Sequence, residues 1–221
     1  MATGLTRPTP EGEAQLVSWD NVETMFHEFG HALHGLFGAY KYPSGGGVAR
    51  DFVEYPSQVN EMWASDPQVL ANYARHHQTG AAMPIELIER IEAAGKWNQG
   101  YELGEVLEAA LLDMEWHALT PEQAAAIATP AQVDAFEAAA LQRLGLEVEL
   151  VPPRYRSSYF RHVFADPAGY SAGYYSYLWT EMLDRDSRAW FRENGGLTRA
   201  NGDHFRETVL SKGGTQDYFE M

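Results

Sequence analysis

The stretch NVETMFHEFGHALHGLF, residues 21–37, sets the fold class of this chain. Its apolar residues recur at helical spacing, so the segment predicts an amphipathic helix. Asp20 and Glu23 resemble a capping box at the start of this helix, and Gly38 suits its end. The four residues LVSW at 16–19 could form a short strand before it.

The helical pattern continues along the rest of the chain. Further helices are expected over residues 51–63, 67–78, 85–94, 101–119, 121–127, 131–144, 171–193 and 199–210. Residues 1–15 predict a loose lead-in, residues 152–169 an irregular stretch, and Gly145 a helix C-cap. The expected fold class is therefore mainly α with little strand, and residues 16–221 are expected to form one domain.

The composition excludes several functional classes. Hydrophobic residues make up 45% of the 221 residues and charged residues 21%, as in an ordinary soluble globular protein. The formal charge is −15, from 16 Lys and Arg against 31 Asp and Glu. This charge argues against binding to nucleic acid or to an anionic membrane surface. No apolar run approaches the roughly 18 residues of a membrane span.

The absence of cysteine restricts the metal chemistry. The chain has no cysteine, so it forms neither disulfides nor thiolate metal sites. Any metal must therefore bind to histidine and carboxylate. The N-terminal residues lack the apolar core of a signal peptide, and the cytoplasm is the expected compartment.

Residues 27–31, HEFGH, form an H-E-x-x-H motif inside the first predicted helix. On a helix, His27 and His31 lie one turn apart on the same face and can reach one metal ion. Glu28 would project beside the metal and take a proton from its bound water. A chance match has a frequency of roughly 2–3% for this composition, and the capped amphipathic context favours the functional interpretation.

A catalytic zinc site needs a third protein ligand and an open position for water. His34 lies on the same helix as the motif, whereas the segment after the glycine-rich turn supplies Asp51, Glu54 and Glu61. An antiparallel second helix could present one of these carboxylates. Spacing alone leaves the three acids as rivals.

Five segments together resemble one known family. In chain order they are HEFGHALHGLF, RDFVEYPSQVNEMW, LLDMEWHAL, PPRYRSSYF and GYYSYLW. They resemble the thimet oligopeptidase and peptidyl-dipeptidase Dcp family of zinc peptidases, and the Dcp branch most closely. The resemblance implies the zincin-like catalytic lobe of the oligopeptidase fold, with one Zn2+ per chain held by His27, His31 and Glu54. Asp51, one turn earlier, is then a candidate to orient a ligating histidine, with a solvated carboxylate as the equal alternative.

Aromatic residues near the C-terminal third form a second candidate group. Taken alone, tyrosines at this spacing are usually core residues. The family pattern of a His, a Gly-Tyr and a Tyr-Tyr-x-Tyr corresponds to His162, Tyr170 and Tyr177 here. The resemblance implies that these three hold substrate and donate hydrogen bonds to the developing oxyanion, and that Tyr174 contacts substrate.

Two further features could contact a peptide. Gly45 and Gly46 match the family's substrate-covering loop, although glycine-rich segments are usually only turns. Arg154 and Arg156 could bind the C-terminal carboxylate of a peptide, although solvent-facing arginines are the favoured interpretation.

The expected function is zinc-dependent hydrolysis of peptide bonds in short peptides, of the peptidyl-dipeptidase or oligopeptidase type. The alternative is a zinc-binding but catalytically weak module that needs a partner chain. Family members carry an N-terminal lobe that forms the opposite wall of a channel. We therefore expect a homo-oligomer, or a companion chain in place of that lobe, with the interface near the metal cleft and residues 16–19.

Overall fold

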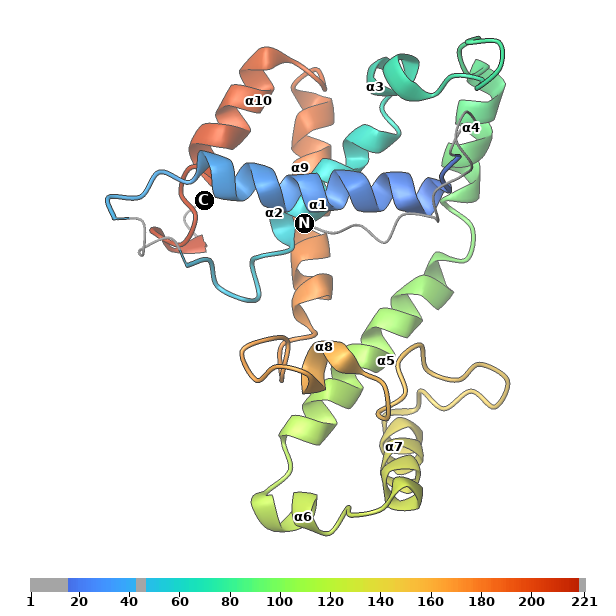
Figure 1. The fold of residues 1–221 in the computed structure, drawn as a ribbon, viewed down its shortest axis with the longest axis vertical. Helices are drawn as coiled ribbons and strands as arrows, with labels where there is room; N and C mark the ends of the chain where they lie inside the picture. The colour runs from blue at the N-terminus through green and yellow to red at the C-terminus, as the bar shows by residue number, and fades with distance from the viewer. Residues whose placement is uncertain (1–15, 43–46, 219–221) are drawn as a thin grey trace, which may run out of the picture. The chain divides into compact units, whose positions relative to one another are not determined.

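The computed structural model describes residues 16–42 and 47–218, and within these ranges the chain is mainly helical (Figure 1). The elements are α1 (Trp19–Phe37), α2 (Tyr55–Glu61), the 3-10 turn η2 (Met62–Ala64), α3 (Pro67–Tyr73), α4 (Ile85–Ala94), α5 (Gln99–His117), α6 (Pro121–Ala125), α7 (Pro130–Leu144), α8 (Arg161–Phe164), α9 (Ser176–Glu193), α10 (Arg199–Phe205) and the π-helical turn η3 (Arg206–Leu210). Extended pairing is limited, among these residues, to two isolated antiparallel bridges. The predicted mainly α class is confirmed. The lead-in predicted over residues 1–15 lies outside the described residues.

The chain divides into two compact units. The first unit contains Met1–Trp97 and Thr180–Met221, and the second contains Asn98–Trp179. Within the described ranges, no helix combines the length and the apolarity needed to cross a bilayer.

The first helix begins two residues earlier than the sequence predicted. Ser18 is its N-cap, and the Ser18 hydroxyl accepts a hydrogen bond from the Asn21 N–H at 3.3 Å. The strand predicted over residues 16–19 is therefore wrong, because Trp19 already belongs to α1. The capping box predicted at Asp20 is wrong for the same reason. Asp20 lies instead in the first turn of α1, where its negative charge interacts favourably with the helix dipole and stabilises the helix.

Several later boundaries also move by a few residues. The helix predicted from residue 51 begins at Tyr55, after a turn, and Pro56 occupies its first turn. The helix predicted over residues 67–78 ends at Tyr73, after which a bridge between Arg75 and Ala82 closes a turn. The helix over residues 85–94 has the predicted bounds.

Backbone conformation explains two further boundaries. Gly145 ends α7 in the left-handed region with φ 71°, as predicted for a C-cap. The helix predicted from residue 171 begins only at Ser176, because Ala172 is also left-handed with φ 52° and interrupts it. The stretch predicted as irregular contains the one-turn helix α8.

In the first unit, α1 and α2 cross at Gly30. A Cβ atom at this position would lie 2.6 Å from Ser57 Cα and 2.8 Å from the Pro56 carbonyl oxygen. The Asn60 side-chain amide also donates a hydrogen bond to the Phe26 carbonyl oxygen at 2.6 Å. The glycine inside the H-E-x-x-H motif therefore allows α2 to approach α1 closely. The buried core beside this crossing consists of Phe52, Tyr55, Val59, Phe191 and Val209.

The second unit is held by apolar packing and by a buried polar network. Its core contains Ala109, Ala110, Phe160, Val163 and Tyr174.

In the polar network, one carboxylate oxygen of Glu137 accepts a hydrogen bond from the Ser157 N–H at 2.6 Å and another from the Ser157 hydroxyl at 2.8 Å. Trp116 Nε1 donates to the same Ser157 hydroxyl oxygen at 2.8 Å. The buried carboxylate of Glu137 is thus satisfied, as a buried charge requires.

Candidate metal centre

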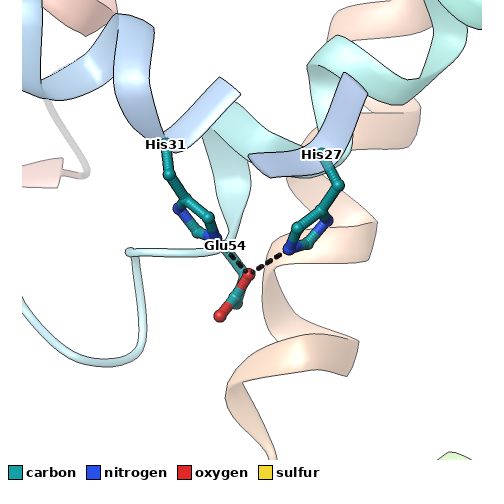
Figure 2. Close-up of side chains that lie close together, drawn as sticks. All are labelled: His27, His31 and Glu54. Atoms are coloured by element: carbon teal, nitrogen blue, oxygen red, sulfur yellow. Dashed lines mark ion pairs between the residues drawn. The ribbon is translucent and has the colours of Figure 1, made fainter. Parts of the chain in front are cut away.

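Two imidazoles on α1 converge on one carboxylate, as Figure 2 shows. His27 Nε2 lies 3.1 Å from Glu54 Oε2, and His31 Nε2 lies 3.2 Å from the same oxygen. The two rings meet edge to face with centroids 4.9 Å apart. The i, i+4 spacing on a helix places both rings on one face, as the motif predicts.

Glu54 reaches this point from the turn that precedes α2. Its side chain is only 3% exposed. The Ser57 hydroxyl donates hydrogen bonds to Glu54 Oε2 at 3.1 Å and to the Glu54 carbonyl oxygen at 2.8 Å. The sequence did not identify Ser57 as a partner of Glu54. The feature that could have indicated it is a serine three residues after an acid at the start of a helix. The geometry separates Glu54 from its rivals, because its carboxylate oxygen lies between the two imidazoles.

Glu61, the last residue of α2, is the second carboxylate that contacts His27. Its Oε1 lies 2.7 Å from His27 Nδ1. The sequence offered Glu61 only as a rival ligand, whereas the structure places it behind the imidazole, where it fixes the ring orientation. Asp51 lies in the turn before α2, and its role in orienting a histidine stays a prediction.

The two acids control the protonation of His27. Burial lowers the pKa of His27, but hydrogen bonds to Glu54 and Glu61 and the charges of both acids outweigh burial and raise this pKa to about 9. His27 Nδ1 carries a proton that Glu61 accepts, and the other ring nitrogen, Nε2, faces Glu54. That tautomer presents a nitrogen lone pair to a metal ion when the imidazole is neutral.

His34 stands apart from this group. It is buried, and its Nε2 has no hydrogen-bond partner in the described part of the chain. Burial, followed by the charge of His31, lowers the pKa of His34. The cluster of possible ligands found among the described residues contains His27, His31 and Glu54 without it.

The cluster fits a tetrahedral metal ion. Its three candidate ligand atoms all lie within 4.8 Å of one another. Zinc bonds to nitrogen and oxygen are about 2.0–2.2 Å long, so neighbouring ligand atoms of a tetrahedron lie roughly 3.3–3.5 Å apart. The observed separations of 3.1 and 3.2 Å come close to that value. Two imidazoles and one carboxylate are also a donor set that catalytic zinc sites use.

The second unit gathers the predicted histidine and tyrosines. Tyr170 and Tyr177 stack with ring centroids 5.4 Å apart, and the His162 ring lies 6.1 Å from that of Tyr170. The Tyr170 N–H also donates a hydrogen bond to the His162 carbonyl oxygen at 3.1 Å. The ligand cluster belongs to the first unit and this aromatic group to the second, and each is assembled within its own unit.

Other predicted contacts have different surroundings. Tyr174 is only 7% exposed and packs against Phe160, and burial together with Tyr155 raises the pKa of Tyr174. Its position favours packing over the predicted substrate contact. Gly45 and Gly46 lie outside the described residues.

Both predicted arginines face carboxylates of their own unit. Arg154 Nη1 lies 3.8 Å from Glu105, and Arg156 pairs with Glu137 and Asp134. Contact of either arginine with a peptide carboxylate stays the less favoured interpretation.

Comparison with known proteins identifies the family. An H-E-x-x-H motif on a helix is typical of metal-dependent peptidases. The whole chain, residues 1–221, matches peptidase family M3. The chain belongs to peptidase family M3, which confirms the resemblance inferred from the sequence.

Individual relatives agree with this assignment. The chain is 54% identical over 208 residues to a dipeptidyl carboxypeptidase of Escherichia coli, covering 93% of this chain and 30% of the relative. It is 33% identical over 228 residues to oligopeptidase A of Salmonella typhimurium, covering 100% and 32%. It is 35% identical over 230 residues to mitochondrial intermediate peptidase 2 of Cryptococcus neoformans, covering 96% and 26%. The chain therefore spans about a third or less of the length of these curated relatives.

Proposed function

We propose that this chain carries the catalytic site of a zinc-dependent peptidase that hydrolyses short peptides. The observation that carries the proposal is the convergence of His27 Nε2 and His31 Nε2 on one oxygen of Glu54. Membership of peptidase family M3 supports peptide hydrolysis. The donor set and its spacing support zinc.

The roles of the residues follow from their chemistry. His27, His31 and Glu54 would hold the zinc ion, and Glu61 would keep the His27 ring in place. Zinc, when bound, supplies Lewis-acid activation of water and of the substrate carbonyl. Glu28 follows His27 directly on α1 and is half-buried, so its carboxylate can serve as the general base that accepts the water proton.

The aromatic group of the second unit would act on the substrate. A tyrosine hydroxyl is neutral at pH 7 and donates a hydrogen bond, which suits stabilisation of a developing oxyanion. Tyr170, Tyr177 and His162 lie together in the second unit, which supports a common role. Their assignment rests on this grouping and on the family resemblance.

The relatives suggest the mode of cleavage. The identity to the dipeptidyl carboxypeptidase is 54%, against 33% to oligopeptidase A. We therefore propose release of C-terminal dipeptides over internal cleavage. A short N-blocked peptide should be cut when its C-terminus is free and spared when the C-terminus is amidated. Equal cleavage of both peptides would favour the oligopeptidase mode.

We also propose that part of α1 is covered by another protein, either a second copy of this chain or a companion chain. Met25, Phe29 and Leu36 are exposed along this helix, with Leu36 at 76%. Exposed apolar side chains gathered on one element suit contact with another protein surface, from a second copy or a companion chain. Light scattering over a wide concentration range tests self-association, and a monomer at every concentration would exclude a second copy.

Metal analysis combined with peptide cleavage tests the proposed function. Dialysed protein should hold one zinc per chain and cleave a quenched fluorescent short peptide, and a chelator should abolish both. Zinc binding without any cleavage would support the weakly catalytic alternative. Absence of zinc binding would refute the proposal.

A further inference from the structure

A buried carboxylate holds the turn that connects the two stacked tyrosines. Asp113 lies in α5 and is 0% exposed. Its Oδ1 accepts a hydrogen bond from the Ala172 N–H at 2.9 Å, and its Oδ2 accepts one from the Tyr174 N–H at 2.9 Å. Both oxygens of one side chain are therefore committed to the same turn.

The backbone of this turn is shaped to receive an anion. Ala172 has φ 52°, in the left-handed region that residues with a Cβ atom rarely adopt. N–H groups of a turn with a left-handed residue can point into one concavity, which binds anionic groups. Here Asp113 fills that concavity. An uncommon conformation at Ala172 persists only where its surroundings hold it, and the two carboxylate bonds supply that restraint.

A third partner completes the anchor. His117 Nδ1 lies 2.7 Å from Asp113 Oδ1, one helical turn further along α5. The His117 ring stacks on Phe164 of α8, with centroids 5.7 Å apart. The carboxylate thus has donors from the turn and from its own helix, which satisfies a buried charge.

The anchored turn carries residues of the proposed site. Tyr170 precedes Ala172 by two residues, and Tyr177 follows Tyr174 by three, at the start of α9. The two rings stack across the turn at 5.4 Å. A shift of the turn would therefore move both hydroxyl groups.

We infer that Asp113 is a positioning residue that sets the placement of the Tyr170 and Tyr177 hydroxyls through the Ala172–Tyr174 turn. This inference rests on the proposed peptidase function. Positioning errors of about 1 Å can cost on the order of 10²-fold in rate, so Asp113 influences turnover without touching substrate.

Amide hydrogen exchange on the wild-type protein tests the anchor without any variant. Ala172 and Tyr174 precede α9, yet their N–H groups should exchange slowly, because a buried carboxylate binds them. Fast exchange at both positions would overturn the inference.

Asp113→Asn tests the catalytic consequence. Asparagine offers one acceptor oxygen and one NH2 group. Its oxygen can accept from only one of the two backbone N–H groups, and its NH2 group would face the other N–H, so two donors would meet. We expect faster exchange at Ala172 or Tyr174, unchanged zinc content, and a kcat reduced on the order of 10²-fold with a much smaller change in KM. Unchanged kcat in a variant with faster exchange would overturn the positioning role.

Ser157→Ala is the matched control. It breaks buried hydrogen bonds to Glu137 and Trp116 in the same unit, away from the bonds of the turn. It should lower stability and leave kcat unchanged. A similar loss of kcat in both variants would show that Asp113 acts only through general stability.

The exchange measurement also separates this inference from the proposed function. A wild-type protein without peptidase activity contradicts the proposed function and, with it, the catalytic consequence of Asp113. Slow exchange at Ala172 and Tyr174 would still identify Asp113 as the anchor of the turn.

Discussion

Oε1 of Glu61 lies 2.7 Å from Nδ1 of His27, on the side of the imidazole opposite the nitrogen that faces Glu54. One short helix, together with the turn before it, therefore supplies both the carboxylate of the candidate metal cluster and the carboxylate that orients one of its histidines. Because such orienting partners fix the tautomer and the basicity of a ligand, Glu61 should contribute to metal affinity.

Glu61→Ala should weaken zinc binding by about 10–100-fold, since the His27 ring loses the acceptor that holds its Nδ1–H. Competition titration against a chromophoric chelator measures this affinity. Glu89→Ala removes an equal charge from an exposed position in α4 and should leave the affinity unchanged. Equal effects of both variants would show that only net charge matters.

Zinc uptake should release a proton at neutral pH. The pKa of His27 is raised to about 9 in the metal-free protein, whereas metal binding requires a neutral imidazole. Calorimetric titrations near pH 7.5, in buffers with different ionisation enthalpies, should report about one proton released per zinc. A heat of binding independent of the buffer would contradict this protonation state.

The same shift sets the pH dependence of metal-free stability. Because the folded-state pKa of His27 lies above its ordinary value of 6.5, protonated His27 stabilises the fold fully below pH 6.5. This contribution is lost as the pH rises through about 9. Thermal unfolding in the presence of a chelator should therefore show a falling Tm between these pH values, and His27→Gln should flatten that slope.

Gly30→Ala should destabilise the protein, because the new Cβ atom would meet the backbone of α2 at 2.6 and 2.8 Å. Overpacking of this kind costs typically about 1–3 kcal/mol. Gly35→Ala, in the same helix, adds a methyl group with no neighbour within 4 Å and should stabilise by about 0.5–1 kcal/mol. Urea denaturation of both variants measures the difference, and equal free energies of unfolding would refute the close crossing.

Tyr170→Phe and Tyr177→Phe should lower kcat more than they raise KM, since an oxyanion donor acts chiefly in the transition state. Loss of one such donor costs roughly 2.7–4 kcal/mol of transition-state stabilisation. Steady-state kinetics with a short quenched peptide separate the two constants. Changes confined to KM would mean that these tyrosines only hold substrate.

Local sequence signals predicted much of this structure. The spacing of apolar residues and the i, i+4 histidines predicted α1 and the shared face of His27 and His31. The bounds of α4 and the C-cap at Gly145 also follow from neighbouring residues alone. These features depend on contacts within one turn or one helix, which is why the sequence contains them.

Features that depend on packing could not be predicted in this way. Two carboxylates of one segment, Glu54 and Glu61, have similar local sequence signals, and only the crossing of α1 and α2 separates the cluster carboxylate from the orienting one. In the sequence, Asp113 is one acid among several in a helical pattern. Its role depends on the contact with the distant turn at Ala172, which local sequence does not reveal. The start of α1 was misplaced because Ser18 and Asp20 are both good N-cap residues, and local spacing does not rank them.

The most direct test of the account is the Glu28→Gln variant, in which zinc content and peptide turnover are measured on the same preparation. Glutamine keeps the shape of the side chain but cannot accept the proton of water, so the account predicts one zinc per chain and a turnover reduced by about 10²–10⁴-fold. Turnover near the wild-type value at full zinc occupancy would contradict the account, because the H-E-x-x-H helix would then not provide the catalytic base.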